Sequence, residues 1–407
     1  MERVPAGVAA TDAPTVRGRL RRYRAPLSLA ALIALTALMF FRTPPIHVAP
    51  ASLYLLASVL PGVPLGPVNA ALGQPSVQSI TFAGAEGTVA ADLYVPPGSG
   101  AHPAILIVNG ALAEGRKYPA LVQFATALAR SGYTALVPDY PDLLHEELTP
   151  ASRQDVELTL RRLNALPSVQ PGHVELVGFC VGGTLGLLAA EDPQTPPLRA
   201  VVDLAGYVSS TDMIQLITTN TYEAGGKLLD YATDPWVVVA VARSLVAGLP
   251  DASDRAVFAP LLGDPPPDHY VAPNWSTLPP ARLSGGGQAL RALLLNRNPA
   301  LVPALIAALP SPMPEQLSAL SPETQLDHLR FPVYVVADRS DTYVPNAQSV
   351  KLEERQPSLV HLSYVSLLAH VEPELPTKSN LLATLTDVAG GAWQLFAAMD
   401  HVLASLQ

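Results

Sequence analysis

Hydrophobic and polar positions alternate in blocks over residues 77–209, and each block has the length of one strand or one helix. Short apolar or β-branched runs predict strands at Val77–Phe82, Thr88–Val95, Ala104–Val108, Thr134–Val137, Val174–Val177 and Ala200–Leu204. Longer stretches with an apolar face predict helices at Pro119–Arg130, Ala151–Leu166 and Gly183–Ala190. Strands that alternate with helices favour an α/β fold, with a mainly parallel sheet covered by helices on both faces.

The alternation stops between Ser209 and about Leu329 and then resumes. Residues 210–329 are rich in proline and apolar helical runs, and no strand is expected there. Strands return at Val333–Ala337 and Leu359–Ser366, and a long helix is predicted at Asn380–Leu406. We therefore expect a core in two parts, residues 77–209 and 330–407, with a helical cap inserted over the carboxyl edge of the sheet. The alternative is a separate helical domain without a role in catalysis.

The N-terminal region has a pattern of its own. Residues 1–24 form a basic tail, and Ala25–Phe41 is a run of 17 uncharged residues. This length reaches the lower limit of a transmembrane helix, and the preceding arginines indicate a cytoplasmic N-terminus. A cleaved signal peptide or a buried helix is the alternative. We expect a single-pass membrane anchor with the body outside the cytoplasm. It is followed by an apolar, proline-rich connector at residues 42–76.

The connector contains a short apolar segment, Ala51–Leu60, between Pro50 and Pro61. Ten residues are too few to span a bilayer as a helix. We expect an interfacial or packed helix, and the sequence leaves open whether it re-enters the membrane.

Composition and charge limit the kinds of partner that the protein is expected to bind. Of the 407 residues only 14% are charged, and the formal net charge is −9. Seven arginines lie within residues 1–42, so the remainder of the chain is acidic. An acidic body repels nucleic acid, which leaves the membrane and a small-molecule substrate as the expected partners. The sequence does not indicate an oligomeric state.

The single cysteine lies in the segment Gly178-Phe179-Cys180-Val181-Gly182-Gly183, between a predicted strand and a predicted helix. This is the context of a nucleophile elbow, a turn so tight that the residues two before and two after the nucleophile must be small. Gly178 and Gly182 meet that requirement, and Gly183 follows. The helix N-terminus would stabilise a thiolate. The backbone N–H of Val181 is one expected oxyanion donor, and a second is expected from Ala111 or Leu112.

The alternating pattern and this elbow resemble the α/β-hydrolase superfamily. The GFCVGG segment is similar to the elbow of the dienelactone hydrolase family, which uses cysteine in place of serine. The resemblance covers roughly residues 77–407, interrupted by the insertion. It implies the chain order nucleophile, acid, histidine.

The family order indicates the other two catalytic residues. Asp341 lies in a D-x-x-V-P segment just past a predicted strand and is the expected acid, with Asp338 as the alternative. His370, in a loop after the last strand, is the expected base, whereas His361 and His401 fall within a strand and a helix. The resemblance therefore implies a Cys180–His370–Asp341 triad that cleaves an ester, lactone or thioester through an acyl-enzyme. Such a route needs no cofactor, and no histidine pair has metal-ligand spacing.

The chain also departs from the family. Dienelactone hydrolases are compact, lack a long cap and carry a gating acid in the loop where Glu114 is the nearest candidate. The cap and anchor favour an apolar substrate near a membrane, and five cap residues could line an acyl pocket: Leu293, Leu294, Leu301, Ile306 and Met313. An acyltransferase on the same fold, or an inactive module that binds lipid or protein, remains an alternative function.

Overall fold

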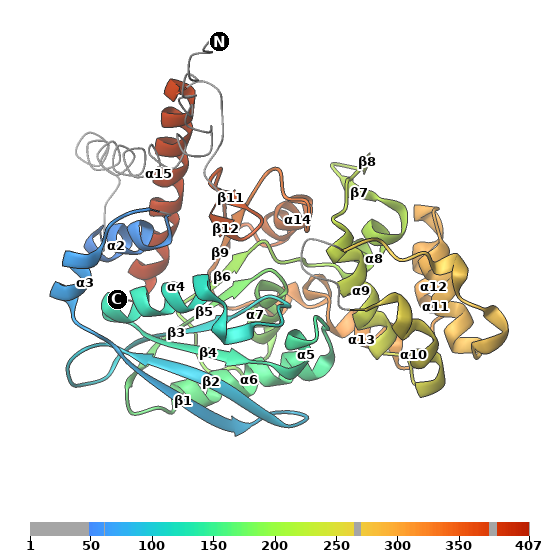
Figure 1. Cartoon of the computed structure of the whole chain (residues 1–407), viewed down its shortest axis with the longest axis horizontal. Helices are drawn as coiled ribbons and strands as arrows, with labels where there is room; N and C mark the ends of the chain where they lie inside the picture. Colours follow the sequence, from blue (N-terminus) through green and yellow to red (C-terminus); the bar gives the residue numbers. More distant parts are fainter. Residues whose placement is uncertain (1–48, 61, 264–269, 374–380, 407) are drawn as a thin grey trace, which may run out of the picture.

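The computed structural model describes residues 49–60, 62–263, 270–373 and 381–406. Its centre is an eight-stranded sheet in the order β1-β2-β4-β3-β5-β6-β9-β10 (Figure 1). The strands are β1 (Ser76–Ala83), β2 (Thr88–Val95), β3 (His102–Val108), β4 (Thr134–Asp139), β5 (Val169–Phe179), β6 (Val201–Leu204), β9 (Val333–Ala337) and β10 (Val360–Tyr364). Strands β4, β3, β5, β6, β9 and β10 pair in parallel, whereas β1 and β2 add an antiparallel edge.

Helices cover both faces of this sheet, as the alternating pattern predicts. Helices α6 (Pro150–Asn164) and α7 (Val181–Glu191) bury Leu160 and Leu187 in the same core as Leu106 of β3. On the other face, α4 (Pro119–Arg130) buries Leu128 against Ile105 of the same strand. Because successive strand residues point to opposite faces, Ile105 and Leu106 supply one apolar side chain to each layer. The result is an α/β-hydrolase-like arrangement.

Two helices distant in sequence complete the second layer. Helix α2 (Ala49–Val59) packs against α15 (Leu381–Ser405), and the Ser52 hydroxyl donates a hydrogen bond of 3.1 Å to Asp400. Leu55 and Leu56 of α2 are fully buried by the body. The predicted short helix at Ala51–Leu60 is therefore a packed helix, and a further short helix, α3 (Gly66–Leu72), follows it.

The expected anchor at Ala25–Phe41 lies outside the described residues. Within the part of the chain that the structure describes, no helix combines the length and apolar character needed to cross a bilayer.

The chain between β6 and β9 forms a group of helices to one side of the sheet, at the right in Figure 1. Its helices are α8 (Ser210–Thr219), α9 (Pro235–Ala247), α10 (Ala252–Phe258), α11 (Gly285–Leu295), α12 (Val302–Ala307) and α13 (Met313–Ala319). The expectation of no strand here is wrong, because β7 (Thr221–Ala224) and β8 (Lys227–Asp230) form a hairpin. Gly225 and Gly226 both adopt positive φ at its turn, the conformation that a two-residue hairpin requires. We refer to residues 210–329 as the cap.

Candidate active site

Cys180 forms the turn between β5 and α7. Its backbone has φ 55° and ψ −127°, a conformation that side-chain-bearing residues adopt only when their surroundings enforce it. The surroundings do so here. The Cys180 N–H donates to the carbonyl of Leu204 on β6, and the Gly183 N–H donates to the carbonyl of Cys180, both at 2.8 Å. The strained turn thus holds the thiol at the N-terminus of α7.

The neighbouring glycines leave no room for a side chain. A Cβ atom on Gly178 would overlap the backbone of Gly182, and one on Gly182 would overlap the carbonyl oxygen of Val108. A Cβ on Gly183 would overlap the carboxylate of the buried Asp203. These close approaches give a physical reason for the glycine pattern that the sequence displays around Cys180.

The structure brings together the expected acid and base. Asp341 Oδ2 lies 2.8 Å from His370 Nδ1, and both side chains are largely buried. The other carboxylate oxygen of Asp341 accepts the N–H groups of Tyr343 at 2.7 Å and Val344 at 3.1 Å. Those two amides fix the carboxylate within the loop after β9, so that its remaining oxygen faces the imidazole.

The environment of His370 links it to Cys180. Burial lowers the pKa of the imidazole, but the nearby charge of Cys180 and the hydrogen bond to the Asp341 carboxylate raise the pKa of His370 to about 10. The Nε2 atom is buried and has no well-formed hydrogen bond to a described residue. Catalytic hydrogen bonds are often long before substrate binds, so this nitrogen is the one available for proton exchange with the thiol.

The alternative acid and bases occupy other surroundings. Asp338 accepts the N–H and hydroxyl of Ser340, both at 2.9 Å, which makes it a turn-forming residue. His361 is exposed on β10 and stacks on Tyr334, and His401 is exposed on α15. Among the described residues, none of the three forms a hydrogen bond, ion pair or ring contact with Asp341 or His370, so the geometry favours Asp341 and His370 over them.

Two backbone amides remain free to hold an oxyanion. No described residue accepts a hydrogen bond from the N–H of Val181 at the start of α7 or from that of Ala111 in the loop after β3. A Cβ placed on Gly110 would lie 3.2 Å from the Cβ of Cys180, so this loop runs directly beside the elbow. Asp139 at the end of β4 holds the loop by accepting the Arg116 N–H at 2.6 Å. Glu114, the nearest candidate for a gating acid, is exposed.

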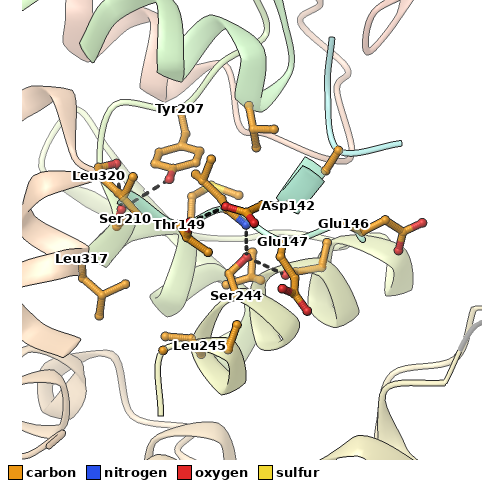
Figure 2. Close-up of a pocket in the computed structure, with 18 of the residues that line it drawn as sticks. Asp142, Glu146, Glu147, Thr149, Tyr207, Ser210, Ser244, Leu245, Leu317 and Leu320 are labelled. Carbon is orange, nitrogen blue, oxygen red and sulfur yellow. Dashed lines mark hydrogen bonds between the residues drawn. The ribbon is translucent and has the colours of Figure 1, made fainter. Parts of the chain in front are cut away.

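A cavity of about 420 Å³ opens beside Cys180, between the end of the sheet and the cap (Figure 2). Ala111 and Val181 line it on the side of the sheet, and apolar residues of α8, α9 and α13 line it on the side of the cap. Of the five cap residues expected to form an acyl pocket, only Met313 lines this cavity. Leu293 and Leu294 are core residues, and Leu301 is exposed. Apolar periodicity identified cap helices but not which of their faces points toward the site.

Several aromatic residues of the site were missed by the sequence reasoning. Tyr343 stacks on His370 with ring centroids 4.6 Å apart, and Trp236 of α9 lies 5.6 Å from Tyr343. The Tyr231 hydroxyl donates a 2.5 Å hydrogen bond to the carbonyl of Asp341. Tyr207 lines the cavity, and burial raises its pKa to about 12. The position of Tyr343, two residues after the candidate acid, is the single signal that the sequence offers for this set.

The site has the chemistry of nucleophilic acyl transfer. A thiol at a helix N-terminus, an imidazole oriented by a buried carboxylate and two unpaired amides are the parts that such a reaction uses. Within the described ranges, no three His, Cys, Asp or Glu side chains converge in a way that could hold a metal ion. Fold and site together define an α/β-hydrolase-like protein.

Comparison with known proteins identifies a family that one segment of the chain, about a third of its length, resembles. Residues 89–223 match the model of the dienelactone hydrolase family. The resemblance predicted from the elbow is therefore confirmed for this segment, which includes Cys180 and ends before Asp341 and His370.

Three individual proteins that resemble this chain share 30% or less of its sequence over the matched residues. A Bradyrhizobium protein described as a probable 2-oxo-3-(5-oxofuran-2-ylidene)propanoate lactonase is 30% identical over 140 residues, which cover 28% of this chain and 53% of the relative. The chain thus matches about half the length of that curated relative. Among solved structures, a dienelactone hydrolase from Anabaena variabilis is 16% identical, with a TM-score of 0.39 over 80% of this chain and 98% of its own. A puromycin-hydrolysing peptidase from Mycobacterium tuberculosis is 13% identical, with a TM-score of 0.49 over 83% and 39%.

Proposed function

We propose that this protein is a hydrolase that cleaves an ester, lactone or thioester bond with Cys180 as the nucleophile. One observation carries the proposal: the buried 2.8 Å contact between His370 and Asp341 lies beside a thiol held at a strained turn. The match to the dienelactone hydrolase family and the relative described as a lactonase support ester-type bonds as the target.

The proposed reaction proceeds in two halves. His370 takes the proton of Cys180, and the thiolate attacks the carbonyl carbon of the substrate. The N–H groups of Val181 and Ala111 bind the resulting oxyanion. When the tetrahedral intermediate collapses, the imidazolium protonates the departing alcohol and a thioester remains on Cys180. A water molecule, deprotonated by His370, then releases the acid and regenerates the thiol. Asp341 fixes the imidazole tautomer and supports its positive charge throughout.

The test compares variants of the full chain on short-chain p-nitrophenyl esters and a simple lactone. We expect Cys180→Ala and His370→Ala to abolish turnover, whereas the exposed His401→Ala retains the rate of the unmodified protein. Undiminished hydrolysis by Cys180→Ala would refute the assignment of the nucleophile. If neither the unmodified protein nor any variant hydrolyses these substrates, an inactive hydrolase-like binding module is favoured.

Transfer of the acyl group to an acceptor other than water uses the same acyl-enzyme. Adding alcohols to the ester assay distinguishes the two outcomes, because a transferase forms a new ester faster than it forms free acid. We propose hydrolysis, and predominant formation of the new ester would contradict it.

A membrane anchor is part of the proposal and rests on the sequence alone. The uncharged run Ala25–Phe41, next to the arginines of residues 17–24, supports a single span with a cytoplasmic N-terminus. We expect the full chain to stay with membranes after alkaline carbonate extraction and to lose that property when residues 1–42 are deleted. Protease added to intact cells should digest the body, and complete protection would contradict the proposed orientation.

A further inference from the structure

The charged side chains that line the cavity beside Cys180 are all acidic. Four carboxylates are among its lining residues, namely Glu86, Asp142, Glu146 and Glu147, and none of the described lining residues is a lysine, arginine or histidine. A cavity lined in this way repels an anionic ligand and attracts a cationic one. The charge of these four residues therefore bears on which acyl compounds can enter.

Three of the four carboxylates either already have hydrogen-bond partners or are exposed to solvent. Asp142 accepts the hydroxyls of Thr149 and Ser152, the latter at 2.9 Å. Glu146 pairs with Arg243 and accepts the Tyr270 hydroxyl at 3.0 Å. Figure 2 shows Glu146 directed away from Glu147. Glu86 is exposed. Their hydrogen bonds already satisfy Asp142 and Glu146, so neither needs a ligand.

Glu147 differs from the other three. It is half-buried, and no described residue forms a hydrogen bond or ion pair with its carboxylate. Burial, the largest effect, raises the pKa of Glu147, and the charges of His145 and Arg243 offset only part of that rise. Figure 2 shows its side chain beside Ser244 of α9, where the cap meets the cavity. A partly desolvated carboxylate without a partner is stabilised by a cationic ligand group.

The aromatic lining provides a second, independent feature of the same kind. Trp236, Tyr343 and Tyr207 all line the cavity, and the first two lie with ring centroids 5.6 Å apart. Aromatic faces attract ammonium groups, so these rings also favour a cation in the cavity. The apolar residues of the cap, among them Leu317 and Leu320, would contact the hydrocarbon part of the ligand.

We propose that this cavity selects acyl substrates whose acyl chain carries an ammonium group, that Glu147 binds this group, and that carboxylate-bearing substrates are disfavoured. The inference rests on the proposed hydrolase function and specifies its substrate class.

The test uses three p-nitrophenyl esters of similar size that differ in terminal charge. They are the 6-(trimethylammonio)hexanoate, its neutral isostere 7,7-dimethyloctanoate, and the monoester of octanedioate, which is anionic. The cationic and neutral esters have the same shape, so the ratio of their kcat/KM values reports charge recognition. Cationic esters with shorter and longer acyl chains show, by their kcat/KM values, which chain length reaches Glu147. The preference should weaken as salt is added, because salt screens charge pairs.

We expect the full chain to prefer the cationic over the neutral ester by about tenfold, the effect of a partly exposed charge pair. Glu147→Gln should remove most of that preference, and Glu147→Lys should shift it toward the anionic ester. Glu354→Gln is the matched control, since Glu354 is exposed on the distant helix α14 (Ala347–Arg355) and the change in charge is the same.

The outcomes separate this inference from the proposed function. Hydrolysis of all three esters with equal kcat/KM, or a cationic preference that Glu147→Gln leaves intact, would overturn the role of Glu147. If none of the esters is hydrolysed in a Cys180-dependent way, the hydrolase function itself fails, and with it the inference.

Discussion

Replacement of Asp341 with asparagine tests how the site orients its base. The change keeps the size of the side chain, and the amide oxygen can still accept the N–H groups of Tyr343 and Val344. It then presents an NH2 group, in place of a carboxylate oxygen, to His370 Nδ1, which lies 2.8 Å away. The imidazole must accept this hydrogen bond, so its proton moves to Nε2, the nitrogen that should receive the proton of Cys180.

The size of the effect follows from the burial and the distance of the pair. The side chains of His370 and Asp341 are 10% and 3% exposed, so solvent screens their interaction little. Two unit charges about 4 Å apart at an effective permittivity of about 20 interact by ~4 kcal/mol. Because 1.36 kcal/mol corresponds to a factor of ten, loss of this support for the imidazolium should lower kcat by about 10³-fold.

The assay is steady-state hydrolysis of a neutral p-nitrophenyl ester, with Asp338→Asn as the matched control. Among the described residues, Asp338 forms hydrogen bonds only with Ser340 in its own turn, so its replacement should change kcat by less than tenfold. If Asp338→Asn lost as much activity as Asp341→Asn, or if Asp341→Asn kept more than a tenth of the original kcat, the reasoning about the acid would be refuted.

The same variant has a defined pH dependence of stability. The folded-state pKa of His370 is raised above its usual 6.5 to about 10. The charge of Cys180 and the hydrogen bond to Asp341 cause this rise, so their interactions with His370 stabilise the fold fully below pH 6.5, and this contribution is lost as the pH rises through about 10. Asp341→Asn should accordingly destabilise the protein more at pH 6 than at pH 10, measured by urea unfolding, and equal destabilisation at both would contradict the pairing.

Two further predictions concern groups outside the proposed triad. Burial raises the pKa of Glu175 to about 8, so its contribution to stability is full below pH 4.5 and is lost as the pH rises through about 8. In urea unfolding, Glu175→Gln should therefore gain stability relative to the unmodified protein between pH 5 and pH 8. Parallel pH dependences of the two proteins would contradict this prediction. Tyr231→Phe removes the hydrogen bond from the cap to the carbonyl of Asp341, which should cost about 1 kcal/mol of stability and lower kcat by less than about tenfold. The neighbouring Tyr222→Phe removes no such bond, and an equal loss of kcat in that control would show that the hydroxyl of Tyr231 has no specific role.

The core of the fold follows from sequence pattern because its signals are local. Parallel strands are apolar on both faces, so they appear as short runs such as Ala104–Val108, and helices on either side show a 3.6-residue period. The elbow is also local: the spacing of Gly178, Cys180 and Gly182 reflects backbone contacts within one turn and one adjacent strand. These features needed no knowledge of distant contacts.

The remaining features depend on contacts between distant segments. The β7–β8 hairpin consists of two four-residue strands with little burial, so hydrophobicity does not mark it. The cavity wall is formed where α8, α9 and α13 meet the sheet, and which face of each helix points inward depends on that packing. The stacking of Tyr343 on His370 and the absence of a partner for Glu147 are likewise tertiary properties.

Covalent capture of the acyl-enzyme tests the central claim most directly. The full chain is mixed with a p-nitrophenyl ester, quenched with acid within milliseconds to seconds, and digested for peptide mass spectrometry. The account predicts one acyl group per chain, located on the peptide that contains Cys180, with its yield increased in a variant that slows attack by water. An acyl group on another residue, or turnover of the ester without acylation of Cys180, would contradict it.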